Sequence, residues 1–145
     1  MIAGAGPRLI RLAGREADII NIAPRPPTLG PTAVGSMGFG LTIHDELNLI
    51  KEAAGSRYDD IELCVFADRM NVTDEDRKPL VEALAASMKT TPEYVEEMPH
   101  TLLGSPQHMA ERIVEAREKY GVTYRIIPAY AGDAFAPVIK MLAGK

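Results

Sequence analysis

The feature that most constrains the fold of this chain is the alternation of strand-like and helix-like segments along it. Short apolar runs are separated by longer stretches in which apolar residues recur every three or four positions, as they do on one face of a helix. The expected strands lie at residues 1–3, 18–22, 61–67 and 124–127, of which 18–22 and 61–67 are nearly continuous apolar runs. Such alternation indicates βα units around a parallel sheet, and the run at 18–22 is of the kind expected when helices cover both faces of that sheet. The sequence therefore predicts an α/β protein with about four parallel strands and covering helices.

Capping residues, prolines and glycines predict where the helices begin and end. Thr42 and Asp45 have the spacing of a capping box, and Gly55 is expected to end the helix that they begin. Pro79 is expected either to kink the helix after the third strand or to delay its start. The other expected helices begin at Pro7, Thr91 and Ser105, and a last one is capped by Asp133.

Apolar positions predict which side chains are buried. The faces expected to pack inward include Leu9 and Leu12 on the first helix and Ile139 on the last. Cys64 is the only cysteine, so the chain can form no intrachain disulfide. Its apolar neighbours predict a buried, inert thiol rather than a nucleophile, which suits a reducing cytoplasm.

Residues 24–41 differ in composition from the rest of the chain, because proline and glycine are concentrated there. They cannot form a continuous helix or a central strand. The stretch is expected to be a long loop, either functional or disordered. With 145 residues, of which 46% are hydrophobic, the chain has the size of one domain, which is expected to extend over residues 1–145.

Charge and hydropathy exclude several classes of partner. The net charge is -4 and the sequence pI is about 5.4, so neither a nucleic-acid-binding nor an anionic-membrane surface is expected. No stretch has the form of a secretory signal or the length of a membrane span, and the chain is expected to be soluble and cytoplasmic. The first 30 residues contain more arginines than acidic residues, so an anionic ligand is expected there.

A glycine-rich turn stands where the first strand ends and the first helix begins. The turn comprises Gly4, Ala5, Gly6, Pro7 and Arg8. Small residues let an anion approach the backbone, free N–H groups of the helix point toward it, and Arg8 can add a charge-assisted hydrogen bond. The turn is therefore a candidate phosphate site. The alternative is a tight turn that only needs flexible glycines; the dinucleotide fingerprint is excluded, because no third glycine follows at its spacing.

Several segments resemble one family of enzymes. They are residues 4–20, 59–63, 103–106, 120–124 and 133–138. Together they resemble the C-terminal half of luciferase-like monooxygenases, particularly the deazaflavin-dependent branch of these oxidoreductases. The resemblance extends over nearly the whole chain, apart from the loop after Pro24.

This resemblance implies half of a TIM-type (β/α) barrel of eight strands. It also implies a cofactor, either the deazaflavin coenzyme or FMN, whose phosphate would lie at Gly4, Ala5, Gly6, Pro7 and Arg8. Active sites of such barrels lie at the carboxyl ends of the strands, which makes Arg25 a second candidate contact; the alternative for Arg25 is a solvent-facing loop residue.

Family members have a preceding half of comparable length, so we expect an incomplete active site here. The expected partner is a second copy, forming a homodimer, or a chain that supplies the missing barrel half. If active, the protein would be an oxidoreductase unit. The alternative is a non-catalytic cofactor-binding or structural dimer derived from that family.

The three histidines, His44, His100 and His108, are expected to be solvated surface residues. No His, Cys or carboxylate cluster has metal-site spacing, so no metal is expected.

Overall fold

Four parallel strands form the main sheet, in the order β1, β2, β3, β6. The structure is a computed structural model that describes residues 1–4, 6–24 and 41–144. The strands are β1 (Ile2–Ala3), β2 (Ile19–Asn21), β3 (Glu62–Phe66) and β6 (Val122–Ile126). Ala3 lies opposite Asn21, Asn21 opposite Cys64, and Cys64 opposite Tyr124, so these side chains form one row across the sheet. The predicted α/β architecture with four parallel strands is confirmed.

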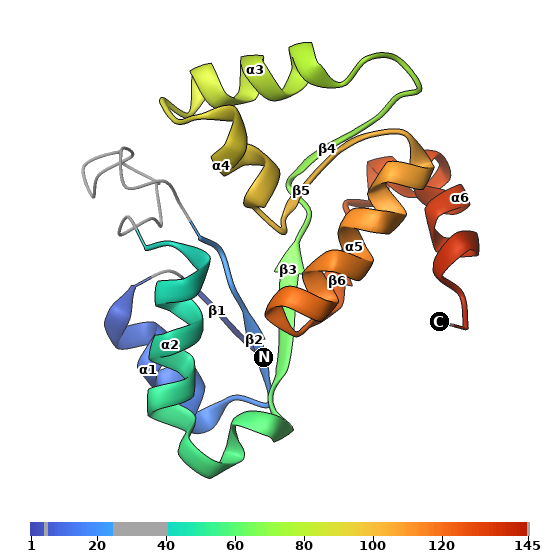
Figure 1. Cartoon of the computed structure of the whole chain (residues 1–145). Coiled ribbons are helices and arrows are strands. Elements are labelled where there is room, and N and C mark those ends of the chain that lie inside the picture. The colour runs from blue at the N-terminus through green and yellow to red at the C-terminus, as the bar shows by residue number, and fades with distance from the viewer. Residues whose placement is uncertain (5, 25–40, 145) are drawn as a thin grey trace.

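Helices cover one face of this sheet. They are α1 (Pro7–Glu16), α2 (Ile43–Ala54), α5 (Pro106–Tyr120) and α6 (Gly132–Leu142), with short 3₁₀ turns η2 (Gly55–Asp60) and η3 (Ala129–Ala131). Figure 1 shows these helices as two pairs, α1 with α2 at the lower left and α5 with α6 at the right. Ile20, Leu63 and Val65 point toward the helices and belong to the largest core cluster.

The other face of the sheet is largely open among the described residues. Phe66 and Tyr124 project from it and are 42% and 40% exposed. The expectation of helices on both faces is therefore wrong. In a barrel wall the second face lies toward the barrel interior, which explains why both faces of the strands are apolar without a second helix layer.

A strand–helix–helix–strand unit lies between β3 and β6. Its elements are β4 (Arg69–Val72), α3 (Lys78–Ser87), α4 (Pro92–Glu97) and β5 (Thr101–Gly104). β4 and β5 pair in parallel with each other as a separate sheet. The unit has a small core of its own, formed by Val81, Ala85, Met88, Val95 and Met98. In Figure 1 it occupies the top of the molecule, beyond the carboxyl end of β3.

Most predicted helix ends are confirmed. The Thr42 hydroxyl accepts a hydrogen bond from the Asp45 N–H (3.2 Å), and the Asp45 carboxylate accepts one from the Thr42 N–H (2.9 Å), which completes the capping box. Gly55 ends that helix with φ 56°. Pro79 occupies the first turn of α3, so it delays the helix start and causes no kink. Asp133, in contrast, lies inside the first turn of α6 and does not cap it.

Three apolar side chains that were expected to be buried are exposed. Leu9 is 38%, Leu12 is 41% and Ile139 is 56% exposed. In α1 the buried positions are Ile10, Ala13 and Gly14, because a neighbouring helix, α2, covers only that flank. The expectation that His100 is a solvated surface residue is also wrong, because its side chain is buried and the residue is only 6% exposed.

Candidate functional site

The glycine-rich turn lies at the carboxyl end of β1. Gly4 has φ +156°, a conformation that favours glycine, and a Cβ atom there would also force the end of the Leu9 side chain, 2.1 Å away at Cδ2, to move. Gly6 is buried and extended at φ −172°, a conformation open to any residue. The predicted site residues Ala5 and Arg25 lie outside the described residues. The same is true of residues 25–40, which make up most of the predicted loop 24–41.

The start of α1 has no side-chain cap. Its N-cap residue is Gly6, whose carbonyl accepts the Ile10 N–H (2.9 Å), and its first turn contains no acidic residue. Pro7 has no N–H, and the N–H groups of Arg8 and Leu9 receive no capping bond from the side chain of a described residue. These donors stand at the positive end of the helix dipole, which favours an anion.

Arginines add positive charge to this helix. Arg8, Arg11 and Arg15 are exposed on α1, and none of them forms an ion pair or hydrogen bond with another described residue. Arg8 is the one in the first turn, next to the uncapped N–H groups. A cation at that end of a helix opposes the dipole, so an anion bound there would relieve an unfavourable interaction as well as form a favourable one.

The chain leaves β2 beside this turn, because β1 and β2 are parallel neighbours. The Ile22 N–H donates to the Cys64 carbonyl (2.9 Å), and the next donor, the Ala23 N–H, bonds to Oε2 of Glu46 (3.0 Å). The Glu46 side chain is only 1% exposed. Sequence reasoning missed Glu46, although its position three residues after Ile43 places it on the apolar stripe of α2 and could have marked it.

The carboxyl ends of β3 and β6 lie along the same end of the sheet as the glycine-rich turn and the β2 exit. The Ala67 N–H donates to the Ile126 carbonyl (2.9 Å), and Asp68 forms an ion pair with Arg69 at 3.7 Å. Oδ1 of Asp68 and Oδ1 of Asn21 are buried and accept no hydrogen bond from a described residue. The structure thus brings the glycine-rich turn and the β2 exit together, with further polar groups along the edge.

Cys64 lies on the open face of the sheet but is itself covered. Its exposed fraction is 0%, and burial raises the pKa of its thiol, with a smaller contribution from the carboxylate of Glu62. The prediction of a buried cysteine is confirmed. His108 is half-buried, and burial together with Arg77 lowers its pKa. His44 is exposed, as expected.

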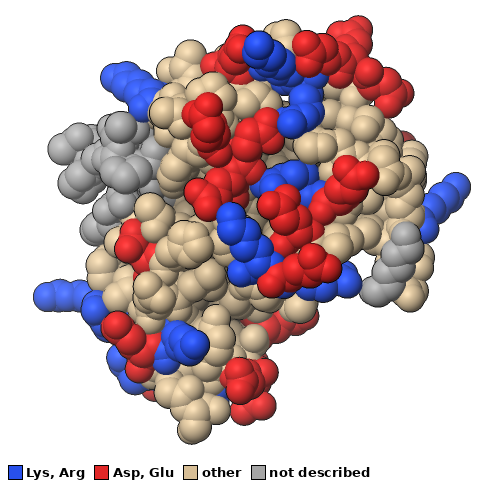
Figure 2. Space-filling model, in the orientation of Figure 1, with Lys and Arg blue, Asp and Glu red and all other residues tan. Residues whose placement is uncertain are grey.

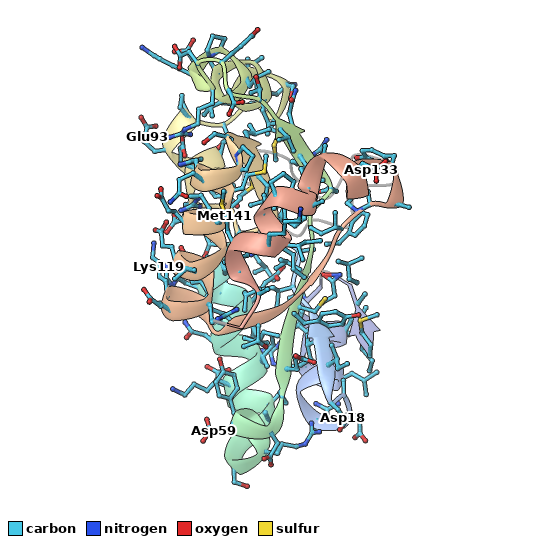
Figure 3. The ribbon with its side chains drawn as sticks, turned by 90° about the vertical axis from the view of Figure 1, so that its right-hand side faces the viewer. Asp18, Asp59, Glu93, Lys119, Asp133 and Met141 are labelled. Carbon is cyan, nitrogen blue, oxygen red and sulfur yellow. The ribbon has the colours of Figure 1, made fainter. Side chains whose placement is uncertain are left out.

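Two grooves in the described part lie away from this edge. One, of about 410 Å³, is lined by residues from Tyr58 to Leu63 with Gly121 and Thr123, at the amino ends of β3 and β6. The other, of about 420 Å³, lies between α3 and α4. Figure 3 shows Asp18 and Asp59 both at the lower end of the molecule, on opposite sides of it, and Asp133 near the upper right. The first groove lies at the amino ends of the strands, whereas (β/α) barrels carry their chemistry at the carboxyl ends; the second belongs to the unit between β3 and β6.

Charged side chains are mixed on the face that Figure 2 shows, and neither sign forms a broad patch there. Ion pairs connect the helices above the sheet, among them Arg77 with Glu96 and Lys119 with Glu97. Within residues 1–4, 6–24 and 41–144, no three His, Cys, Asp or Glu side chains are grouped so that they could hold a metal ion. No helix in that part of the chain combines the length and the apolar character that crossing a membrane requires.

Neither a protein-family model nor a curated protein matches the sequence. Solved structures do match. The chain is similar to the crystal structure of riboflavin lyase (RcaE) with modified FMN and substrate riboflavin, at a TM-score of 0.58 and 14% identity over 97% of this chain and 41% of that one. It is also similar to an F420-dependent secondary alcohol dehydrogenase in complex with an F420-acetone adduct, at a TM-score of 0.52 and 16% identity over 97% and 46%.

These likenesses concern the fold, since the identities are low. They support the half-barrel fold that the sequence resemblance implies, in which the four-strand sheet with its helices is half of a (β/α) barrel. The chain spans less than half of the length of either neighbour.

Proposed function

We propose that this chain is the cofactor-phosphate-binding unit of a luciferase-like oxidoreductase that uses FMN or a deazaflavin coenzyme. The observation that carries the proposal is the uncapped start of α1 beside Gly4, at the carboxyl end of a barrel strand. The lyase structure holds modified FMN and the dehydrogenase structure holds an F420-acetone adduct, so both similar proteins bind a cofactor of this type. The residues proposed to contact the cofactor are Gly4, Ala5, Gly6, Pro7, Arg8 and Arg25.

Each part of the turn has a separate task in this proposal. Gly4 lets the backbone turn without a side chain in the path of the anion, and the first N–H groups of α1 donate to phosphate oxygens. Arg8 adds a charge-assisted hydrogen bond. The bound cofactor supplies hydride or oxygen chemistry, including monooxygenation, while the protein binds and orients it.

We further propose that turnover requires a second set of (β/α) units. The outer edges of the two edge strands, β1 and β6, pair with no other strand among the described residues, and Phe66 and Tyr124 are exposed on the open face. A second copy, giving a homodimer, or a chain that supplies the other barrel half would cover them. In this proposal residues 1–145 act as one domain in the cytoplasm. Alone, the chain binds cofactor and shows no appreciable turnover.

The test is a fluorescence titration with FMN and with the deazaflavin coenzyme. Arg8→Ala should weaken binding about tenfold or more, because one hydrogen bond to a charged group is worth about 1.5–3 kcal/mol. Arg15→Ala is the matched control: Arg15 is also exposed and unpaired among the described residues, but it lies in the last turn of α1. The affinity of the Arg15→Ala protein for either cofactor should stay within about twofold of the wild-type affinity.

Equal binding by wild type and Arg8→Ala would remove Arg8 from the site. Absence of binding by the wild-type chain to either cofactor would refute the cofactor-binding role and leave a structural dimer as the better description. Binding without turnover when the other barrel half is supplied would favour a non-catalytic cofactor-binding protein.

A further inference from the structure

Glu46 occupies a position where the packing of α2 calls for an apolar residue. The buried residues of this helix are Ile43, Glu46, Ile50 and Ala54. Glu46 is 1% exposed, and a carboxylate removed from water in this way loses solvation free energy. Packing alone would therefore favour an apolar side chain of similar size.

Helix capping does not account for the carboxylate either. Thr42 and Asp45 already form the capping box of α2, with hydrogen bonds in both directions. Glu46 lies one residue further along and contributes nothing to that motif. The helix dipole favours a negative charge near this end, but an exposed position would provide the same benefit without the cost of burial.

The contact that distinguishes Glu46 joins α2 to the exit of β2. Its Oε2 accepts the Ala23 N–H at 3.0 Å, across 23 positions of sequence. Ala23 follows directly after Ile22, whose N–H makes the last bond to β3, and precedes the fully buried Pro24. Glu46 thus fixes the first residues beyond the strand, where no further ladder bond is described.

We propose that Glu46 is a positioning residue that holds the exit of β2 against the phosphate-binding turn; this inference rests on the proposed function. β1 and β2 are adjacent, with Ala3 opposite Asn21, so the turn that follows Ala3 and the exit that follows Asn21 form neighbouring parts of one edge. If the Ala23 backbone shifts, the wall of the cofactor site next to Gly4 shifts with it. Glu46 itself acts through Ala23 and does not contact the cofactor.

The test compares Glu46→Ala with the conservative variant Glu46→Gln, whose amide oxygen can still accept the Ala23 N–H. Ile50→Val is the matched control, because Ile50 is fully buried on the same stripe and provides no acceptor. Two quantities are measured well below the melting temperature of every variant. They are the hydrogen-exchange rate of the Ala23 amide by NMR and the Kd for FMN.

For Glu46→Ala we expect Ala23 exchange to accelerate about tenfold or more and the Kd for FMN to rise at least about fivefold. For Glu46→Gln and Ile50→Val, the Ala23 exchange rate and the Kd for FMN should both stay within about twofold of the wild-type values. If Glu46→Ala does not fold, Glu46→Leu, which keeps the volume and removes the acceptor, replaces it.

A Glu46→Ala protein that binds FMN as tightly as wild type would overturn the positioning role, whatever its exchange rate. A control Ile50→Val protein with the same loss of affinity would overturn it too, because general destabilisation would then explain the effect. If the wild-type chain binds no FMN or deazaflavin, the proposed function fails, and the positioning role with it. The wild-type titration therefore distinguishes the two failures.

Discussion

The carbonyl oxygen of Ile50 lies 2.9 Å from the position that a Cβ atom on Gly14 would occupy. Cβ of Ala53 would be 3.0 Å from the same point, so α1 and α2 approach each other closely because residue 14 has no side chain. Arg57 adds to this contact by donating to the Gly14 carbonyl at 2.7 Å. The relationship explains why α1 buries Gly14 rather than its leucines.

Gly14→Ala should therefore destabilise the fold. Alanine is the better helix former by about 1 kcal/mol, but overpacking against a backbone carbonyl typically costs about 1–3 kcal/mol. We expect a net loss, measured as a lower urea midpoint. Gly132→Ala is the control, because nothing lies within 4 Å of its added Cβ at the start of α6; it should be neutral or slightly stabilising. A stabilised Gly14→Ala protein would show that the helices are free to move apart.

Cys64 should react slowly with thiol reagents in the native state. Its side chain is 0% exposed, and its pKa is raised, mainly by burial, so less thiolate is present at a given pH than in a free cysteine. Labelling by a disulfide reagent at pH 8 should be on the order of 100-fold slower than in urea. Tyr130→Cys in a Cys64→Ser background provides the exposed comparison, since Tyr130 is 80% exposed. Fast native labelling of Cys64 would contradict its burial.

The Glu97 carboxylate should stabilise the fold in a pH-dependent way. Its pKa is lowered, first by the hydrogen bond from the Lys119 ammonium (3.2 Å), and the Tyr120 hydroxyl also donates to it (3.1 Å). A lowered folded-state pKa means that the stabilisation is complete above the unfolded value of 4.5 and is lost as the pH falls through the folded value.

Glu97→Gln should accordingly be less stable than wild type at pH 7, and the difference should shrink as the pH falls below 4.5. Urea midpoints between pH 3 and pH 7 measure it. The difference should be small, because Glu97 is 42% exposed and solvent screens the pair. Glu118→Gln, an exposed residue of α5 without a described ion pair, should show no such loss. Equal midpoints for Glu97→Gln and wild type at pH 7 would show that the bond contributes nothing.

The open face of the sheet should mediate self-association. Phe66→Ser and Tyr124→Ser each remove an aromatic side chain that is about 40% exposed there, so they should weaken any dimer that sedimentation equilibrium detects. Tyr130→Ser is the control, because Tyr130 lies in η3 outside the sheet. A wild-type chain that remains monomeric at micromolar concentration would contradict this prediction, and so would dimers that both sheet variants leave unchanged.

Three of the four main strands could be predicted from short apolar stretches, and β6, whose sequence includes Thr123 and Arg125, from its place after the glycine that ends α5. β4 and β5 could not, since they are four residues each and mix polar with apolar residues, as in Arg69 to Val72. Their pairing partner is non-local, and no local pattern encodes it. Leu9 and Leu12 were assigned to the core because helical spacing identifies an apolar stripe but not whether a neighbouring element covers it.

For the site, the turn at Gly4 was predictable because glycine, proline and a following helix have a local signature. The sequence did not show which glycine is conformationally special; Gly4 has the positive φ, whereas Gly6 is extended. The apolar stripe of α2 could have marked Glu46 as buried but not its role, because its partner, the Ala23 N–H, belongs to the backbone of a distant segment. Such a donor leaves no trace in the identity of residue 23.

The self-contained pairing of β4 with β5 has a consequence for how this chain can vary. No hydrogen-bond ladder of the main sheet passes through residues 69–104, and that unit has its own core. A lengthened, shortened or exchanged unit would therefore leave the register between β3 and β6 intact. Only the part of this unit between β4 and β5 can change freely, because Met70, Val72 and Leu102 pack in the core formed by α5 and α6 and tie the two short strands to the wall beneath them.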